Sequence, residues 1–193
     1  EMANMTKQEA EAFSKKGNDT FYKLERFPIP TIAAINGFAL GGGMEIAMSC
    51  DIRICSSNAL FGQVEVGLGI TPGFGGTQRL PRIVSMTVAK ELVFTGRKIK
   101  ADEAQSINLV SHVYPLEELM DQAMKMAKTI AKNAPIAVRM SKKAMNEGVE
   151  CVMEEAIVLE EKYFAATFET EDQREGMACF LDRNREKKPY QNR

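Results

Sequence analysis

Apolar residues with strand-like spacing alternate with segments of helical spacing through the first 114 residues of the chain. Four runs predict strands: Thr31 to Asn36, Asp51 to Cys55, Ala59 to Gly62 and Leu109 to Val113. Apolar positions three and four residues apart predict helices over Thr6 to Glu25, Val84 to Phe94 and Ala101 to Ser106. The first helix is expected to be interrupted near Gly17 and Asn18, and the second to end at Gly96 as a cap.

From Pro115 onward the pattern is entirely helical. Amphipathic helices are predicted over Leu116 to Ala131, Pro135 to Met145, Glu150 to Thr167 and Glu171 to Arg183. This order predicts an α/β core over residues 1–114 and a helical region over residues 115–193. The apolar faces of the helical region exceed what covering its own core requires, so we expect it to take part in oligomerisation.

Glycine is concentrated in one window of the chain. Ten of the fourteen glycines fall between Gly37 and Gly76, and three are consecutive at Gly41 to Gly43, where a helical pattern begins. Without a Cβ, the backbone there can approach a ligand closely. A helix that starts at these glycines also leaves its first N–H groups free to face developing negative charge. We therefore look for the chemistry in this window.

Two carboxylates, Glu45 and Glu65, stand out in the same window. Each follows a glycine-containing element and is flanked by apolar residues, so each is expected to be partly desolvated. Burial raises the pKa of a carboxylate. Two neighbouring carboxylates also shift each other's pKa values apart, so that one can act as acid and the other as base. Taken singly, however, an acidic residue on a helix is usually solvated, and a triple glycine is often only a loose turn. The spacing alone leaves both interpretations open.

Charge and hydropathy exclude several function classes. Twenty-five basic and 26 acidic residues are mixed along the 193 positions, for a formal net charge of −1. This provides no basic stripe of the kind that nucleic-acid binding needs. No apolar run reaches the roughly 18 to 20 residues that span a bilayer, and no signal-peptide pattern opens the chain. We therefore expect neither a nucleic-acid nor a membrane partner.

The cysteine and histidine content argues against disulfide and metal chemistry. The cysteines are too few and too irregular for a disulfide framework, which favours a reducing compartment such as the cytoplasm: Cys50, Cys55, Cys151 and Cys179. His112 is the only histidine, which excludes a His-rich metal site and argues against a Ser-His or Cys-His nucleophile. We expect no metal site.

Two longer blocks give the chain a family resemblance. Residues Ile32 to Ile54, with the sequence IAAINGFALGGGMEIAMSCDIRI, and residues Phe61 to Leu80, with the sequence FGQVEVGLGITPGFGGTQRL, closely resemble the crotonase, or enoyl-CoA hydratase, family. Later motifs, among them Asn133-Ala134-Pro135, extend the likeness to the C-terminus. The resemblance implies a crotonase-type α/β fold, a superhelix of ββα turns with a helical C-terminal region.

The resemblance also implies roles for four residues. Gly42 would donate its N–H to the thioester carbonyl oxygen as half of an oxyanion hole, and Glu45 and Glu65 would hold the water that adds to the acyl Cβ. Gly73 would help to place that water through its N–H. One departure is Val64, since the family usually has Pro immediately before the second glutamate.

A second departure concerns the start of the chain. The family's N-terminal ββα turns supply the other oxyanion N–H and much of the coenzyme A pocket, and residues 1–193 contain no counterpart of them. We expect such turns to precede Glu1 in the full-length protein.

The function implied by the resemblance is that of an enoyl-CoA hydratase, equally a 3-hydroxyacyl-CoA dehydratase, in fatty-acid or butyrate-type metabolism. The partner is then an acyl-CoA substrate, coenzyme A is part of that substrate rather than a cofactor, and a homotrimer or dimer of trimers is expected. Two alternatives stay open: a crotonase-type enoyl-CoA isomerase, and a non-catalytic RNA-binding member of the family. Isomerases commonly retain only one acidic residue at these two positions, so the presence of both favours hydration. The balanced charge argues against RNA binding.

Overall fold

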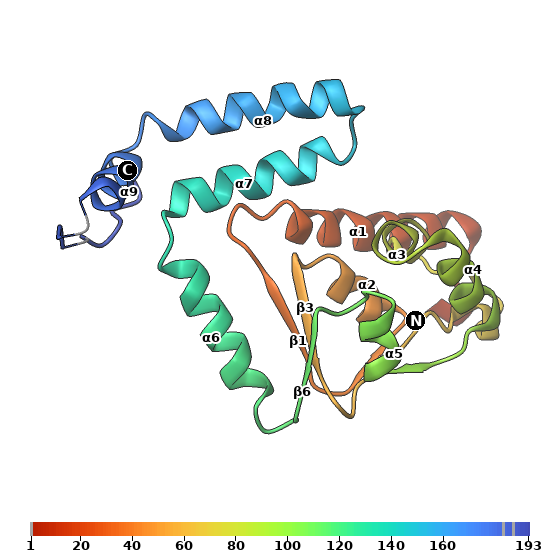
Figure 1. Cartoon of the computed structure of the whole chain (residues 1–193). Helices are drawn as coiled ribbons and strands as arrows, with labels where there is room; N and C mark the ends of the chain where they lie inside the picture. Colours follow the sequence, from red (N-terminus) through yellow and green to blue (C-terminus); the bar gives the residue numbers. More distant parts are fainter. Residues whose placement is uncertain (1, 183, 187) are drawn as a thin grey trace. The chain divides into compact units, whose positions relative to one another are not determined.

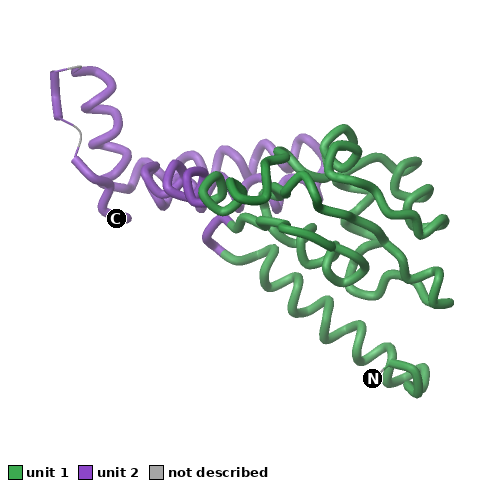
Figure 2. The backbone as a smooth tube through the Cα atoms, turned by 90° about the horizontal axis from the view of Figure 1, so that it is seen from below, with its two compact units in different colours: residues 1–27, 31–123 green, residues 28–30, 124–193 purple. Residues whose placement is uncertain are grey.

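A computed structural model describes residues 2–182, 184–186 and 188–193 of the chain. The chain forms two compact units, the first of residues 1–27 and 31–123 and the second of residues 28–30 and 124–193 (Figure 2). The division falls within helix α6 (Leu119–Ala131). The assignment of residues 1–114 to a core and 115–193 to an oligomerisation region stays a prediction.

The first unit contains two three-stranded sheets. One sheet is parallel, in the order β1-β3-β6, with Ile32 opposite Ile52 in its register. In the other, β2 pairs with β4 in parallel and β4 pairs with β5 antiparallel. The strand bounds are β1 Ile32–Ile35, β2 Phe38–Leu40, β3 Ile52–Ser56, β4 Leu60–Gly62, β5 Ile99–Lys100 and β6 His112–Tyr114.

The first four strands of the first unit alternate between the two sheets. In each of the first two strand pairs, one strand belongs to each sheet. Helix α2 follows β1 and β2, and η2, α3 and α4 follow β3 and β4; Figure 1 labels the three α-helices. This is the repeated ββα arrangement that the sequence predicts. The helical bounds in this unit are η1 Met2–Asn4, α1 Lys7–Glu25, α2 Gly42–Met48, η2 Glu65–Leu68, α3 Gly76–Ile83, α4 Met86–Thr95 and α5 Ala101–Ser106.

The core of the first unit draws on both sheets and on helices α2 to α5. Its largest fully buried apolar side chains include Met44 from α2, Phe61 from β4, Leu80 from α3 and Leu92 from α4. Burial of a side chain of this size contributes about 1.5–3 kcal/mol. Because Met44 is adjacent to Glu45 in sequence, packing of α2 into the core also fixes the position of that carboxylate.

Several features of the first unit differ from the sequence-based expectation, and strand β5 and helix α3 are among those not predicted. Helix α1 runs without interruption through Gly17 and Asn18. Strand β2, with only three residues beside the triple glycine, was not predicted. The glycine-rich stretch from Gln63 to Leu80 has the composition of an irregular loop, but in the structure it contains η2 and the start of α3. The cap at Gly96, by contrast, is confirmed, because this residue ends α4 with a φ of 61°.

The second unit consists of helices. They are the C-terminal part of α6 with α7 (Pro135–Gly148), α8 (Met153–Thr167) and α9 (Glu171–Leu181). Helices α7 and α8 pack side by side as a hairpin (Figure 1), and the Tyr163 hydroxyl donates to Glu147 across it. The predicted end of the last helix at Arg183 lies outside the described residues.

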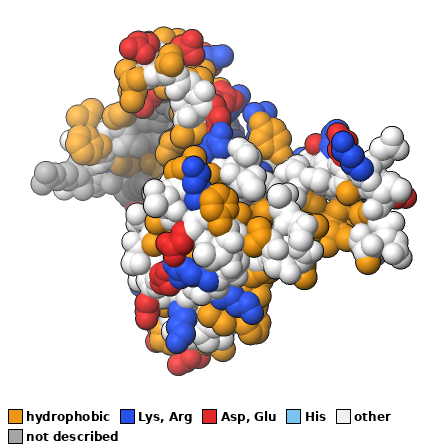
Figure 3. All heavy atoms as spheres, turned by 90° about the vertical axis from the view of Figure 1, so that its right-hand side faces the viewer, with side chains coloured by type: hydrophobic (Ala, Val, Ile, Leu, Met, Phe, Trp, Pro, Cys, Tyr) orange, Lys and Arg blue, Asp and Glu red, His pale blue; other side chains and the backbone are white. Residues whose placement is uncertain are grey.

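The surface carries charge of both signs. Acidic and basic side chains are interspersed with exposed hydrophobic ones over the face drawn in Figure 3, in keeping with the formal net charge of −1. Among the residues that the structure describes, we find no helix with the length and apolar character to cross a bilayer.

Candidate active site

One cavity of the first unit brings together all four residues that the sequence singles out. It has a volume of about 680 Å³, and Gly42, Glu45, Glu65 and Gly73 all line it. Apolar side chains form much of the remaining wall, among them Met2, Met5, Phe13, Leu68 and Ile70. A mostly apolar cavity with a few convergent polar groups is the usual form of a small-molecule site.

Glu45 is held in the first turn of α2 and is almost completely buried, with 1% of its surface exposed. Its Oε1 accepts hydrogen bonds from the backbone N–H of Phe74 at 2.9 Å and from that of Gly76 at 2.8 Å. Gly76 is the first residue of α3, so the second donor belongs to a helix N-terminus. Two N–H donors compensate the negative charge of a carboxylate that has little contact with water. The other oxygen, Oε2, lies near Gly42, at 4.0 Å from the position that a Cβ on that residue would take.

Glu65 opens η2 and is also buried. Burial raises the pKa of Glu65 above the ordinary range; backbone N–H groups of Val64 and Glu65 oppose the rise, and the nearby charge of Glu45 adds to it. Its carboxylate lies against Gly41, where an added Cβ would stand 2.9 Å from Oε1. Gly41 also has a φ of 52°, so glycine is needed there for both conformation and space.

Gln63 is a neighbour of Glu65 that the sequence analysis did not identify. It is completely buried. With its amide nitrogen turned toward Glu65, the orientation that the hydrogen-bond pattern favours, it donates to both carboxylate oxygens, at 3.1 and 3.2 Å. An added Cβ on Gly76 would stand 2.8 Å from the Gln63 amide, so that glycine makes room for it. The only sequence signal was a polar residue at the end of a buried strand, two positions before Glu65.

Of the two predicted N–H donors, one begins a helix and the other lies in a loop. Gly42 is the first residue of α2, so its N–H has no acceptor within the helix. Gly73 lies in the loop before α3, and its carbonyl oxygen accepts hydrogen bonds from Ser14 at 2.6 Å and Asn18 at 2.9 Å. Both glycines line the cavity, which leaves their predicted roles open to test.

Val64, where the family usually has Pro, precedes η2 with a φ of −100°. This value lies outside the range of about −65 ± 15° that a proline ring imposes. The backbone at Val64, next to Glu65, therefore has a conformation outside the range usual for the family's proline.

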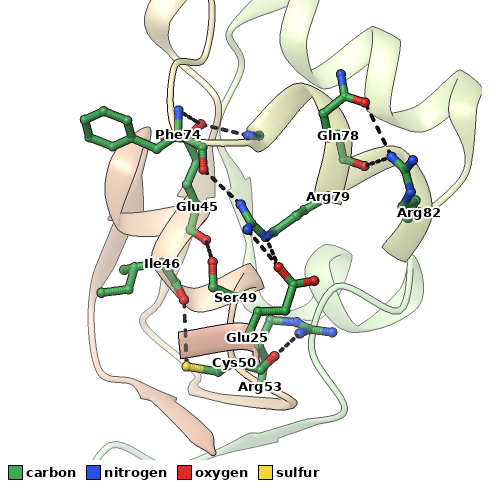
Figure 4. A network of polar contacts seen from close by, with 11 residues as sticks. Glu25, Glu45, Ile46, Ser49, Cys50, Arg53, Phe74, Gln78, Arg79 and Arg82 are labelled. Atoms are coloured by element: carbon green, nitrogen blue, oxygen red, sulfur yellow. Dashed lines mark hydrogen bonds and ion pairs between the residues drawn. The ribbon is translucent and has the colours of Figure 1, made fainter. Parts of the chain in front are cut away.

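Arg79 fixes the loop that holds Glu45. Its Nη1 donates to the Phe74 carbonyl oxygen at 2.9 Å, while Nε and Nη2 donate to Glu25 at 3.1 and 2.8 Å (Figure 4). Phe74 thus donates to Glu45 through its N–H and accepts from Arg79 through its carbonyl. The site can bind a carbonyl oxygen at an N–H group, and its two carboxylates can exchange protons with a bound molecule.

Comparisons with known proteins show which family the chain is similar to. A model of the family described as enoyl-CoA hydratase/isomerase matches residues 1–192. The chain is 54% identical over 185 residues to a short-chain-enoyl-CoA hydratase of Clostridium acetobutylicum, covering 96% of this chain and 71% of that protein. It is 50% identical over 184 residues to a crotonyl-CoA hydratase of Syntrophomonas wolfei, covering 95% of this chain and 71% of that protein.

A solved structure extends the similarity to the fold. The crystal structure of an enoyl-CoA hydratase from Bacillus anthracis superimposes with a TM-score of 0.93 at 38% identity, covering 99% of this chain and 73% of that one. The crotonase-type fold predicted from the sequence is therefore confirmed, and the chain belongs to the enoyl-CoA hydratase/isomerase family.

Proposed function

We propose that this protein is an enoyl-CoA hydratase, which adds water reversibly across the double bond of a trans-2-enoyl-CoA thioester. The observation that carries the proposal is the pair of buried carboxylates, Glu45 and Glu65, on one cavity beside the first N–H of α2. Hydration needs a base for water, an acid for Cα and a donor at the oxygen where negative charge develops. The site has a candidate for each requirement.

The proposed mechanism assigns a role to each group. The Gly42 N–H binds the thioester oxygen, and a single donor of this kind is typically worth about 3 to 4 kcal/mol of barrier. Glu45 accepts a proton from the attacking water as its oxygen bonds to Cβ. Glu65, whose pKa burial raises, delivers a proton to Cα. The Gly73 N–H helps to place the water.

The names of the relatives support a short acyl chain for the proposed substrate. Three relatives at 50% identity or more are two short-chain-enoyl-CoA hydratases and a crotonyl-CoA hydratase. Apolar residues of the cavity wall, including Met5, Phe13 and Leu68, suit a hydrocarbon chain.

Coenzyme A is part of the substrate, and the proposed reaction needs no metal or redox cofactor. Four free thiols support a reducing compartment such as the cytoplasm.

A product assay tests the proposal against isomerisation. The full-length protein is supplied with a short trans-2-enoyl-CoA and, separately, with the corresponding 3-enoyl-CoA, and products are identified by mass. We expect rapid gain of one water by the 2-enoyl thioester. Migration of the double bond of the 3-enoyl thioester without hydration of the 2-enoyl thioester would mean that the protein is an isomerase.

We also propose that the protein assembles as a homotrimer or a dimer of trimers. Many apolar side chains of the second unit are exposed, including Val149 at 75%, Phe164 at 65% and Phe180 at 81%. A closed symmetric assembly would bury such side chains. Light scattering of the full-length protein at micromolar concentration should give the mass of three or six chains. A monomer under these conditions would refute the proposal.

A further inference from the structure

The peptide group between Gly73 and Phe74 connects helix α1 to Glu45. At one end its carbonyl oxygen accepts hydrogen bonds from Ser14 Oγ at 2.6 Å and Asn18 Nδ2 at 2.9 Å. At the other end its N–H donates to Glu45 Oε1 at 2.9 Å. Donors on a carbonyl oxygen polarise the whole peptide group and strengthen its N–H as a donor. Ser14 and Asn18 therefore act on Glu45 through one intervening peptide.

The side chain of Phe74 is fixed by the same face of α1. Its ring contacts those of Phe13 and Phe21, with centroid distances of 5.2 and 5.6 Å. Gly17 lies between these two phenylalanines in sequence, four residues from each, and hence on the same helical face. A Cβ on Gly17 would stand only 2.3 Å from the Phe74 ring, so the ring occupies the space that a side chain would fill.

Local helix stability does not account for these residue choices. Serine, asparagine and glycine are all weaker helix formers than alanine, and here they share one face of a single helix. None of the described residues of α1 is fully buried, so demands of the core do not explain them either. What Ser14, Gly17 and Asn18 have in common is contact with the Gly73–Phe74 segment.

We infer that Ser14, Gly17 and Asn18 are positioning residues for proton transfer by Glu45, because together they set the Gly73–Phe74 peptide with its N–H directed at that carboxylate. The inference rests on the proposed catalytic role of Glu45. Ser14 also lines the cavity, but the role inferred for all three residues is to position Glu45 rather than to exchange a proton themselves.

The test compares kcat and KM for hydration of a short trans-2-enoyl-CoA by full-length variants. The double variant Ser14→Ala/Asn18→Ala leaves the Gly73 carbonyl without both side-chain donors. We expect kcat to fall about 10- to 100-fold, the scale of a misplacement near 1 Å, with KM changed only a few-fold. The single variant Ser14→Thr keeps a hydroxyl and leaves Asn18 unchanged, so its kcat should be higher than that of the double variant. Thr20→Ala is the matched control, because the Thr20 hydroxyl bonds to the Lys16 carbonyl within the helix.

The same double variant is then made in a Glu45→Gln protein. If Ser14 and Asn18 act through Glu45, their removal there should cause no further loss of kcat. An equal loss in both backgrounds would mean a general structural defect and would overturn the inference, as would an unchanged kcat in the wild-type background. Full activity of Glu45→Gln alone would instead overturn the proposed function, and the inference with it.

Gly17→Ala provides a second route should the double variant fail to fold. Alanine favours the helix, so α1 itself should tolerate the change, but the added methyl group displaces the Phe74 ring. We expect kcat to fall at least 10-fold with Glu45 present, the scale of a small misplacement, and to be unaffected in the Glu45→Gln background. A Gly17→Ala protein with wild-type kcat would contradict the inference.

Discussion

Replacing either Glu45 or Glu65 by glutamine in the full-length protein is expected to lower kcat for hydration of a short trans-2-enoyl-CoA by about 10²- to 10⁴-fold. Glutamine keeps the size of each side chain but can neither take up nor deliver a proton at neutral pH. Because both carboxylates line one cavity and are buried, solvent cannot readily replace either of them. The loss is measured as the rate at which the conjugated thioester disappears.

Thermal unfolding provides the control for these two variants. The pKa of Glu65 is raised in the folded protein, so folding favours its protonated form and its charge lowers stability above that pKa. Glu65→Gln removes this charge, and the variant should melt at or above the wild-type temperature at pH 7. The difference in melting temperature between Glu65→Gln and the wild type should vanish as pH falls below the ordinary glutamate pKa of about 4.3. A folded variant with more than a tenth of wild-type kcat, a loss of under about 1.4 kcal/mol, would refute the role of that carboxylate.

Gly41→Ala is the second substitution with a large expected effect. A φ of 52° strains any residue with a Cβ, and the new methyl group would stand 2.9 Å from Oε1 of Glu65. We expect a loss of about 1–3 kcal/mol in the free energy of unfolding. We also expect kcat to fall about 100-fold, because Glu65 must move away from its position in the cavity. Both are measured on the full-length protein, by denaturant unfolding and by hydration of a short trans-2-enoyl-CoA.

Gly43→Ala is the matched control for Gly41→Ala. Gly43 lies two residues further along, inside α2, with no atom within 4 Å of an added Cβ. Alanine there should leave kcat near wild type and raise stability, by up to about 1 kcal/mol. Equal kcat values in the two variants would show that the conformation of Gly41 does not position Glu65.

The parts of the site that the sequence could predict are those with local signals. The triple glycine before a helical pattern pointed to Glu45, and the second glycine-rich block pointed to Glu65. The family resemblance of the same two blocks singled out Gly42 and Gly73. The structure places all four around one cavity. Helix α5 has the bounds that its apolar spacing and acidic first turn predict, since both of these are properties of adjacent residues.

The parts that the sequence could not predict depend on contacts between distant residues. From its neighbours in sequence, Gly17 predicts a break in α1. Its actual reason is distant in sequence, since the Phe74 ring occupies the space that a Cβ on Gly17 would fill. Ser14 and Asn18 reach the Gly73 carbonyl across 59 and 55 residues of chain, which no periodicity can encode. Strand β2 has three residues, too few to establish an alternation.

The central claim is that Glu45 and Glu65 act together in one hydration step. The most direct test measures kcat of the double variant Glu45→Gln/Glu65→Gln beside kcat of the two single variants. Residues that act as a unit have strongly non-additive effects, since removing one already disables the step. We predict that the double variant hydrates a short trans-2-enoyl-CoA within about threefold of the slower single variant. Losses that multiply, so that the double variant is slower by the product of the two single effects, would contradict the account.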